Sequence, residues 1–212
     1  IAASIPGVDV DGILAGNCDD DFLVGSALAG LKREHMSDVD GEAPIGGPGT
    51  AVEVDETLIG GIKKGKHMRG SAGKHVVLGM MQRDGDIITK VVPNQRKTTL
   101  QPIVAENVIP GGQLHTDELN SYKGLHTQGY RHMTVNHGAG EYVGFQGASV
   151  NGIEGFWSQL KRSINGTHIH VSGKHLWKYA KEAEYRFNRR DCAETMLSEL
   201  LGTFGPLPER RD

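Results

Sequence analysis

The sequence lacks any long apolar run and is poor in cysteine. No stretch of about 18 consecutive apolar residues occurs in its 212 residues, which excludes a membrane-spanning helix of ordinary length. The two cysteines, Cys18 and Cys192, lie far apart, and neither belongs to a C-x-x-C pair. This spacing excludes a zinc ribbon within the chain and gives no sign of a disulfide framework. We therefore expect a soluble protein of a reducing compartment, the cytosol.

The charges that are present are unevenly distributed along the chain. Residues 1–56 contain twelve Asp and Glu but only Lys32 and Arg33, whereas residues 57–212 contain twenty-one Lys and Arg against fourteen Asp and Glu. A basic body attracts a polyanion, and an acidic arm repels it or covers the basic surface. Charge alone leaves two interpretations open: a body that binds nucleic acid, or a solvated surface behind an acidic leader.

Composition divides the chain into three parts. Residues 1–50 form an acidic leader rich in Gly and Asp, with an apolar patch at 22–31 and a Gly/Pro linker at 41–49. The texture changes to alternating and apolar segments from residue 51 onward. We expect one domain over 51–192, followed by a C-terminal helix and tail over 193–212.

Within the expected domain, strands come first and helices dominate the end. Period-2 alternation, a continuous apolar run and a β-rich return across an Asp-Gly turn predict three antiparallel strands. Strands are expected at 51–59, 75–81, 87–92, 113–117 and 131–135, and apolar stripes predict helices at 100–108, 151–165 and 174–188. This order predicts an α/β fold of the ribonuclease H-like class, with a mixed sheet of about five strands and flanking helices.

Three carboxylates stand out in this layout. Asp55 lies in the first strand, Asp117 ends the fourth, and Glu154 lies on the second helix. A carboxylate inside a strand is costly unless it faces solvent, a partner or a metal. Converging carboxylates can hold two Mg²⁺ about 3.5–4 Å apart, which is an arrangement that cleaves phosphodiesters. The residues alone leave a metal site and ordinary solvent-facing acids both open.

The helix that carries Glu154 presents a row of polar groups. Asn151, Glu154, Ser158 and Lys161 follow i, i+3, i+7, i+10 spacing and share one face, opposite an apolar stripe. Such a row would supply a metal ligand and, two turns on, a lysine for a DNA phosphate. An ordinary amphipathic surface helix accounts for the same pattern.

Five motifs in one order extend these observations. They are VEVDETLIGG, KHVVLGMMQR, LHTDELNSYKGL, VNHGAGEYV and the long stretch that begins VNGIEGFWSQLKR. This series, over residues 50–190, closely resembles the DDE-superfamily transposases of bacterial insertion sequences, in the branch with an EVDE / TD / NxxEGFWSxLKR core. The resemblance implies a ribonuclease H-like catalytic domain that cleaves DNA at transposon ends and joins the cut strand to target DNA.

The resemblance also assigns roles to residues in the matching motifs. Asp55 and Asp117 resemble the two metal-binding aspartates of the family, and Glu154, 37 residues after Asp117, resembles the third acidic ligand. Lys161 follows Glu154 by seven residues, as DDE helices usually show. Asn151 is the competing third ligand, because members of this branch can use asparagine there and both residues share a helix face.

Cofactors and partners follow from the same resemblance. It implies two Mg²⁺ (or Mn²⁺) ions, double-stranded DNA as substrate, a homodimer or larger synaptic assembly, and a cytoplasmic protein that associates with the nucleoid when bound to DNA. The residues expected to contact DNA phosphates are all basic: Lys161, Arg162, Arg186, Arg189 and Arg190. Two other functions stay open: a related nuclease that does not transfer strands, and an inactive DNA-binding remnant of a decayed element.

Residues adjacent to the expected ligands receive other assignments. Glu56 and Glu118 should point to the opposite strand face from those ligands, since neighbouring residues in a strand alternate. Trp157 is assigned to the apolar core. His115, two residues before Asp117, is either a support for that ligand or a plain strand histidine.

Overall fold

The computed structural model describes residues 43–60, 74–135, 149–168, 171–192 and 195–196. The apolar patch expected at 22–31, most of the fourth motif and nearly all of the tail at 193–212 lie outside these residues. Two compact units are distinguished: Glu42–Asn188, and a second made of Ile1–Gly41 with Arg189–Asp212. The helices and strands described next belong to the unit Glu42–Asn188.

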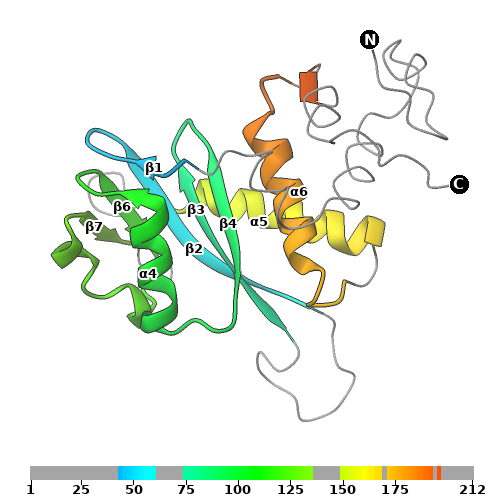
Figure 1. Ribbon diagram of the computed structural model, residues 1–212, viewed down its shortest axis with the longest axis horizontal. Coiled ribbons are helices and arrows are strands. Elements are labelled where there is room, and N and C mark those ends of the chain that lie inside the picture. Colours follow the sequence, from blue (N-terminus) through cyan, green and yellow to red (C-terminus); the bar gives the residue numbers. More distant parts are fainter. Residues whose placement is uncertain (1–42, 61–73, 136–148, 169–170, 193–194, 197–212) are drawn as a thin grey trace, which may run out of the picture. The chain divides into compact units, whose positions relative to one another are not determined.

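A mixed sheet of five strands, counted over the described residues, forms the centre of this unit. Its strands are β2 (Ala51–Ile59), β3 (His75–Gln82), β4 (Ile87–Val92), β6 (Gln113–Thr116) and β7 (Arg131–Thr134). Their spatial order is β4-β3-β2-β6-β7; β3 is antiparallel to β2 and β4, and β6 and β7 are parallel to β2 (Figure 1). The predicted strands and the ribonuclease H-like fold class are confirmed.

β3 is buried on both faces, and its sequence explains why. Leu78 and Met80 contact the apolar cluster on one face of the sheet, and Val77 and Met81 contact the cluster on the other. A strand covered on both sides needs no polar alternation, so the segment reads as one continuous apolar run. The predicted turn between β3 and β4 is present, with Asp84 in the left-handed conformation at φ 56°.

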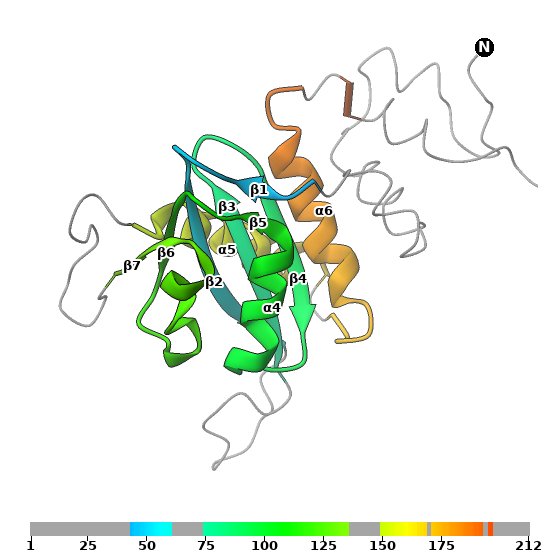
Figure 2. The ribbon, with the colours of Figure 1, turned by 60° about the vertical axis from the view of Figure 1, so that its left-hand side comes forward.

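Helices cover both faces of the sheet (Figures 1 and 2). α4 (Lys97–Asn107) packs on one face, where Leu100 and Val104 are fully buried. α5 (Asn151–Ser163) and α6 (Leu176–Asn188) pack on the other face. Each helix follows an apolar stripe in the sequence. In the described ranges, no helix is long and apolar enough to cross a membrane.

Two predicted boundaries near β2 and α4 differ from the structure. The stretch 41–49, expected to be a linker, contains strand β1 (Ile45–Gly46), which pairs in parallel with β5 (Val108–Ile109). Val108 was expected on the helical stripe, but α4 ends at the preceding residue and Val108 is buried as part of β5. Pairing between segments so far apart in the chain decides this structure, and local periodicity does not report it.

Short helical turns complete the unit. η1 (Asn120–Tyr122) and η2 (Leu125–Gln128) separate β6 from β7, and a π-helical turn, η5 (Ile164–His168), extends α5. The helix predicted at 151–165 therefore ends as α5 at Ser163, and η5 carries the helical path on to His168.

α6 contains a buried ion pair that local sequence patterns do not predict. Lys181 Nζ lies 2.6 Å from Glu184 Oε1, and both side chains are almost fully buried. Glu184 Oε2 accepts hydrogen bonds from the backbone N–H (2.7 Å) and the hydroxyl (2.5 Å) of Thr89 on β4. Asn188 similarly bonds to the backbone N–H and carbonyl of Ile87. These side chains satisfy the outer edge of β4, which closes that edge to pairing with another strand.

Candidate active site

Asp55 and Asp117 lie at neighbouring positions on adjacent strands. β2 and β6 pair in parallel with Val54 opposite Thr116, and the two aspartates come next along each chain. The charge of Asp117 also contributes to the raised pKa of Asp55, so the two carboxylates lie within electrostatic reach. Parallel pairing therefore brings together two predicted ligands that are distant in the sequence.

Asp55 lies in an electronegative and partly desolvated environment. The pKa of its carboxyl is raised from 3.8 to about 7, mainly by burial and in addition by the charges of Glu56 and Asp117. The indole N–H of Trp157 donates a hydrogen bond to Asp55 Oδ2 (3.0 Å), which lowers the pKa but does not cancel the rise. The site concentrates negative charge that a cation would stabilise.

Trp157 links α5 to Asp55. It is buried, as predicted for a core residue, but its indole N–H also binds the candidate ligand. Gly79 on β3 lies opposite Asp55 in the strand register, and a Cβ at Gly79 would lie 2.6 Å from the Trp157 ring. The missing side chain at Gly79 is what lets the indole lie against the sheet beside Asp55.

Replacing Gly79 by alanine is expected to displace Trp157 from Asp55. The overlap should cost about 1–3 kcal/mol in the free energy of unfolding, measured by urea denaturation. The emission of Trp157, isolated by Trp177→Phe, should shift as the indole loses its acceptor. Gly155→Ala is the matched control, because a Cβ there meets nothing within 4 Å and alanine favours a helix by about 0.5–1 kcal/mol. Wild-type stability and emission in Gly79→Ala would contradict this account.

Asp117 is held by bonds within its own loop. Its Oδ1 accepts a hydrogen bond from the N–H of Leu119 (2.9 Å), and its carbonyl accepts one from the hydroxyl of Thr116 (2.8 Å). Because this hydroxyl has one proton, His132 Nε2 (2.9 Å) donates to Thr116 Oγ1. Burial lowers the pKa of His132, which agrees with a neutral ring. These contacts hold the end of β6 in one conformation beside Asp55.

The three predicted polar residues of α5 are exposed: Asn151, Glu154 and Lys161. Glu154 and Lys161 lie three residues before and four residues after Trp157, so they share the side of the helix from which Trp157 reaches Asp55 and do not lie opposite the apolar stripe as the sequence pattern suggested. Across the described segments, no three His, Cys, Asp or Glu side chains are grouped so that they could hold a metal ion. The structure brings the two aspartates together and places Glu154 on the neighbouring helix, without a complete three-carboxylate cluster.

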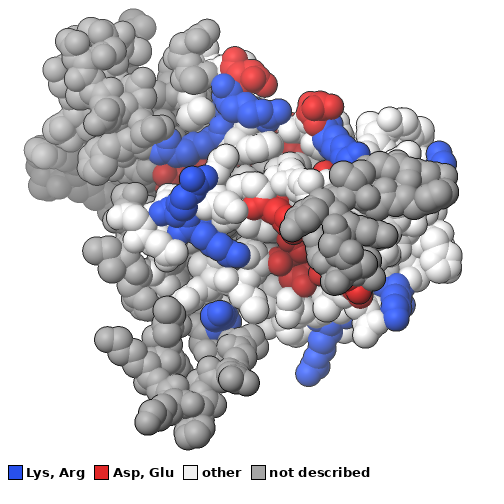
Figure 3. All heavy atoms as spheres, turned by 180° about the vertical axis from the view of Figure 1, so that it is seen from behind, with Lys and Arg blue, Asp and Glu red and all other residues white. Residues whose placement is uncertain are grey.

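The basic residues predicted to contact DNA fall into two groups. Lys161 and Arg162 are exposed on α5. Arg186 on α6 forms an ion pair with Glu182, one helical turn earlier, with 3.2 Å between Nη2 and Oε1. Arg189 and Arg190 follow the end of α6 and belong to the other compact unit. On the side of the molecule opposite α4, acidic side chains gather in a patch with Lys and Arg on its flanks (Figure 3).

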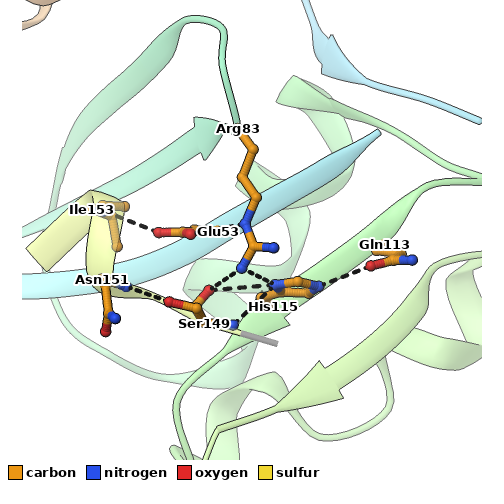
Figure 4. A network of polar contacts seen from close by, with 7 residues as sticks. All are labelled: Glu53, Arg83, Gln113, His115, Ser149, Asn151 and Ile153. Atoms are coloured by element: carbon orange, nitrogen blue, oxygen red, sulfur yellow. Dashed lines mark hydrogen bonds and ion pairs between the residues drawn. The ribbon is translucent and has the colours of Figure 1, made fainter. Parts of the chain in front are cut away.

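A buried polar network beside the two aspartates was not predicted from the sequence (Figure 4). Glu53 is buried and accepts hydrogen bonds from Arg83 Nε (3.1 Å) and from the backbone N–H of Ile153 (3.0 Å). His115 is fully buried, with Nδ1 3.0 Å from Arg83 Nη2. Glu53 and His115 each lie two residues before a predicted aspartate, and residues two apart in a strand share a face. This spacing is the sequence signal that could have placed them beside the site.

Glu56 lies on the opposite face of β2 from Asp55, as the sequence predicts. Its carboxylate accepts hydrogen bonds from the Tyr122 hydroxyl and from Gln95 Nε2 (2.9 Å). Burial raises the pKa of Glu56; the bond from Tyr122 opposes this rise, the charge of Asp117 adds to it, and the bond from Gln95 opposes it. Glu56 is thus engaged on the other face but still adds negative charge to the surroundings of Asp55.

The donor set fits a hard divalent cation. Asp55 and Asp117 offer carboxylate oxygens from neighbouring strand positions, and Mg²⁺ in phosphoryl-transfer sites is usually held by one or two carboxylates together with substrate phosphates. The raised pKa of Asp55 agrees with this fit, since a cation beside the carboxyl would favour its ionised form.

Comparison with known proteins identifies the family of the chain. The family model described as an ISXO2-like transposase domain matches residues 46–188. An uncharacterized transposase-like protein of Haemophilus influenzae is 34% identical to the chain over 120 residues, which cover 54% of this chain and 93% of that protein. The range that the family model matches, 46–188, contains the five-stranded sheet and the helices α4, α5 and α6.

Proposed function

This chain belongs to the ISXO2-like transposase domain family, and on that premise we propose that it is a DDE-type transposase. It cleaves a DNA strand at the end of an insertion sequence and joins the released 3′-hydroxyl to target DNA. Asp55 and Asp117 are the proposed metal ligands on the sheet, and Glu154 on α5 is the proposed third ligand, with Asn151 as its competitor. The proposed cofactors are two Mg²⁺ or Mn²⁺ ions.

The observation that carries this proposal is the position of Asp55 and Asp117, which directly follow the paired residues Val54 and Thr116 on adjacent parallel strands. Two carboxylates at neighbouring positions of parallel strands are costly in a half-buried site unless a cation compensates them. α5 lies over this pair and is linked to it by the bond between Trp157 and Asp55. An aspartate that only faced solvent would require neither a second aspartate beside it nor a hydrogen bond from a buried tryptophan.

The chemistry comprises two in-line displacements at phosphorus. In the first, a water oxygen forms the new P–O bond and the 3′-oxygen of the element leaves with the proton. In the second, the oxygen of that 3′-hydroxyl forms the new P–O bond and loses its proton, and a 3′-oxygen of the target strand leaves and takes up a proton. When bound at the carboxylates, divalent ions supply activation of the attacking oxygen and stabilisation of the leaving oxygen. Asp55 and Asp117 are the residues that would hold those ions.

Basic residues of the helices are proposed to hold the DNA. Lys161 lies on the same side of α5 as Trp157 and Glu154, where it would contact a phosphate next to the reacting bond. Arg162 and Arg186 would position the duplex without reading its sequence. Because two transposon ends must be joined in one reaction, we also propose a homodimer or larger synaptic assembly, acting in the bacterial cytoplasm at the nucleoid.

The test uses labelled DNA that carries the element's own ends, with Mg²⁺ or Mn²⁺. Wild-type protein is expected to give both cleaved and joined products, and Asp117→Asn is expected to give neither. Glu118→Gln is the matched control, since Glu118 is exposed, adjoins Asp117 and loses the same charge. Cleavage without joining would favour the nuclease, and DNA binding without either reaction would favour the inactive remnant.

A further inference from the structure

Glu53 lies on the same face of β2 as Asp55, and both of its carboxylate oxygens are engaged by other groups of the protein. Its Oε1 is engaged by Arg83 Nε at 3.1 Å, and its Oε2 by the backbone N–H of Ile153 at 3.0 Å. The side chain is buried. A carboxylate held through both oxygens is not offered to a metal or to substrate. Glu53 therefore connects β2 to the first turn of α5.

The first turn of α5 depends on this distant acceptor. In the described part of the chain, the N-cap residue Val150 makes no side-chain cap hydrogen bond. The N–H groups at the start of a helix are ordinarily satisfied by a Ser, Thr, Asp or Asn at the cap. Here Glu53, 100 residues earlier in the chain, accepts from Ile153, and its charge suits the positive end of the helix dipole.

Gly152 allows this turn to approach the sheet. A Cβ at Gly152 would lie 3.0 Å from Glu53 Oε2 and 3.2 Å from the sulfur of Met81. A side chain there would be in tight contact with Glu53 and Met81, and one of these neighbours would have to shift. The glycine next to Asn151 in the NGIEG segment therefore serves close packing against Glu53.

Arg83 and His115 hold the chain just before the helix (Figure 4). Arg83 Nη2 lies 3.0 Å from His115 Nδ1 and 3.2 Å from the carbonyl of Ser149. Because arginine only donates, His115 Nδ1 accepts, and its Nε2–H donates to Gln113 Oε1 (3.2 Å). Ser149 Oγ in turn accepts from the N–H of Asn151 (3.1 Å). The segment that enters α5 is thereby tied to both β2 and β6.

We propose that Glu53, supported by Arg83 and His115, is a positioning residue for the third ligand of the site. Glu53 and Asp55 lie two residues apart on β2. The strand that supplies the first proposed ligand therefore also fixes the distance between β2 and the start of α5, the helix that supplies the third. Glu154 follows directly after the amide that Glu53 holds. The inference rests on the proposed function for its catalytic meaning.

Two substitutions at Glu53 separate its contacts. Glu53→Gln keeps an acceptor for the Ile153 amide but loses the charge that pairs with Arg83, whereas Glu53→Ala loses both. Val104→Ala is the control for lost stability, because Val104 is a fully buried residue of α4, on the other face of the sheet. Each variant is measured by hydrogen exchange of the peptide containing Ile153, by Mn²⁺ affinity from electron paramagnetic resonance, and by single-turnover cleavage at saturating DNA alongside DNA affinity.

Glu53→Ala is expected to speed hydrogen exchange in the first turn of α5. It should also weaken Mn²⁺ binding and slow single-turnover cleavage by about 10–100-fold, which is the usual effect of removing a group that orients a metal ligand. DNA affinity should be unchanged. Glu53→Gln should recover part of each loss, and Val104→Ala should show none of these effects.

Exchange and Mn²⁺ affinity at wild-type values in Glu53→Ala would overturn the proposal, and so would equal losses in Val104→Ala. Failure of the proposed function gives a different result. The wild-type protein would then neither cleave nor join DNA, while exchange and Mn²⁺ affinity would still decide whether Glu53 positions the start of α5.

Discussion

Asp55→Asn is expected to abolish DNA cleavage and joining, with a loss of at least about 1000-fold in the single-turnover rate. The substitution keeps the size of the side chain and an acceptor for the Trp157 indole, but it removes the anionic ligand. Charge stabilisation by a bound metal is worth several kcal/mol in phosphoryl transfer, and about 1.4 kcal/mol corresponds to a factor of ten in rate. Product formation on end-containing DNA with Mg²⁺ measures the loss.

The same substitution is expected to make the metal-free protein more stable above pH 7. The pKa of Asp55 is raised from 3.8 to about 7, so the folded state binds the proton more tightly than the unfolded state does. Stability attributable to this group is therefore present below pH 4 and is lost as the pH rises toward 7 and beyond. Asn is neutral at every pH, so thermal denaturation at pH 8 in chelator should show a gain of up to about 4 kcal/mol.

Added Mg²⁺ provides the check on this interpretation. It should stabilise the wild-type protein at pH 8, because a ligand that binds only the folded state raises the melting temperature. It should not stabilise Asp55→Asn. Asp86→Asn, at an exposed carboxylate in the β3–β4 turn, is the matched control and should behave like wild type. A metal-free Asp55→Asn protein less stable than wild type at pH 8 would refute the electrostatic account.

Glu154→Gln is expected to reduce cleavage far more than Asn151→Ala, by about 100–1000-fold against less than tenfold. Helix geometry gives the reason. At about 100° per residue, Glu154 lies about 60° from Trp157 around α5, whereas Asn151 lies about 120° from it. Trp157 points to Asp55, so Glu154 is the better directed of the two residues. Loss of an anionic ligand should cost several kcal/mol of transition-state stabilisation.

Single-turnover rates and Mn²⁺ affinities of the two variants decide between the candidate ligands. Glu182→Gln on α6 is the control for a lost surface charge, because Glu182 pairs with Arg186 on its own helix. A large loss in Asn151→Ala with wild-type behaviour in Glu154→Gln would assign the third ligand to asparagine. Equal, small losses in both would mean that α5 supplies no metal ligand.

Much of the fold is contained in local patterns of the sequence. Three patterns each indicate a local structure and the number of faces that it buries: the alternation in β2, the continuous apolar run of β3 and the apolar stripe of α5. Asp55 and Asp117 could be selected for the same local reason, since charges at strand positions are unusual and adjacent motifs resemble those of a known family. Periodicity also placed Glu56 on the opposite face of β2 from Asp55.

Other features depend on contacts between distant segments, and local patterns do not contain them. The assignment of Val108 to β5 depends on its partner Ile45 in β1. The burial of Glu184 depends on the edge of β4, whose backbone donor at Thr89 needs an acceptor. From the sequence alone, a charged residue on a helix is predicted to be exposed, because its spacing does not indicate which segment packs against it.

The sequence by itself determined the family, through a series of motifs in one order, and the fold class, through periods of two and 3.6 residues. It also predicted the two aspartates of the candidate site. Only the tertiary structure decided how the site is held together. The parallel pairing of β2 with β6 sets Asp55 beside Asp117, and Trp157 reaches Asp55 because Gly79 leaves room for its ring. Glu53 satisfies the start of a helix 100 residues away, and such a hydrogen bond exists only once the chain has packed.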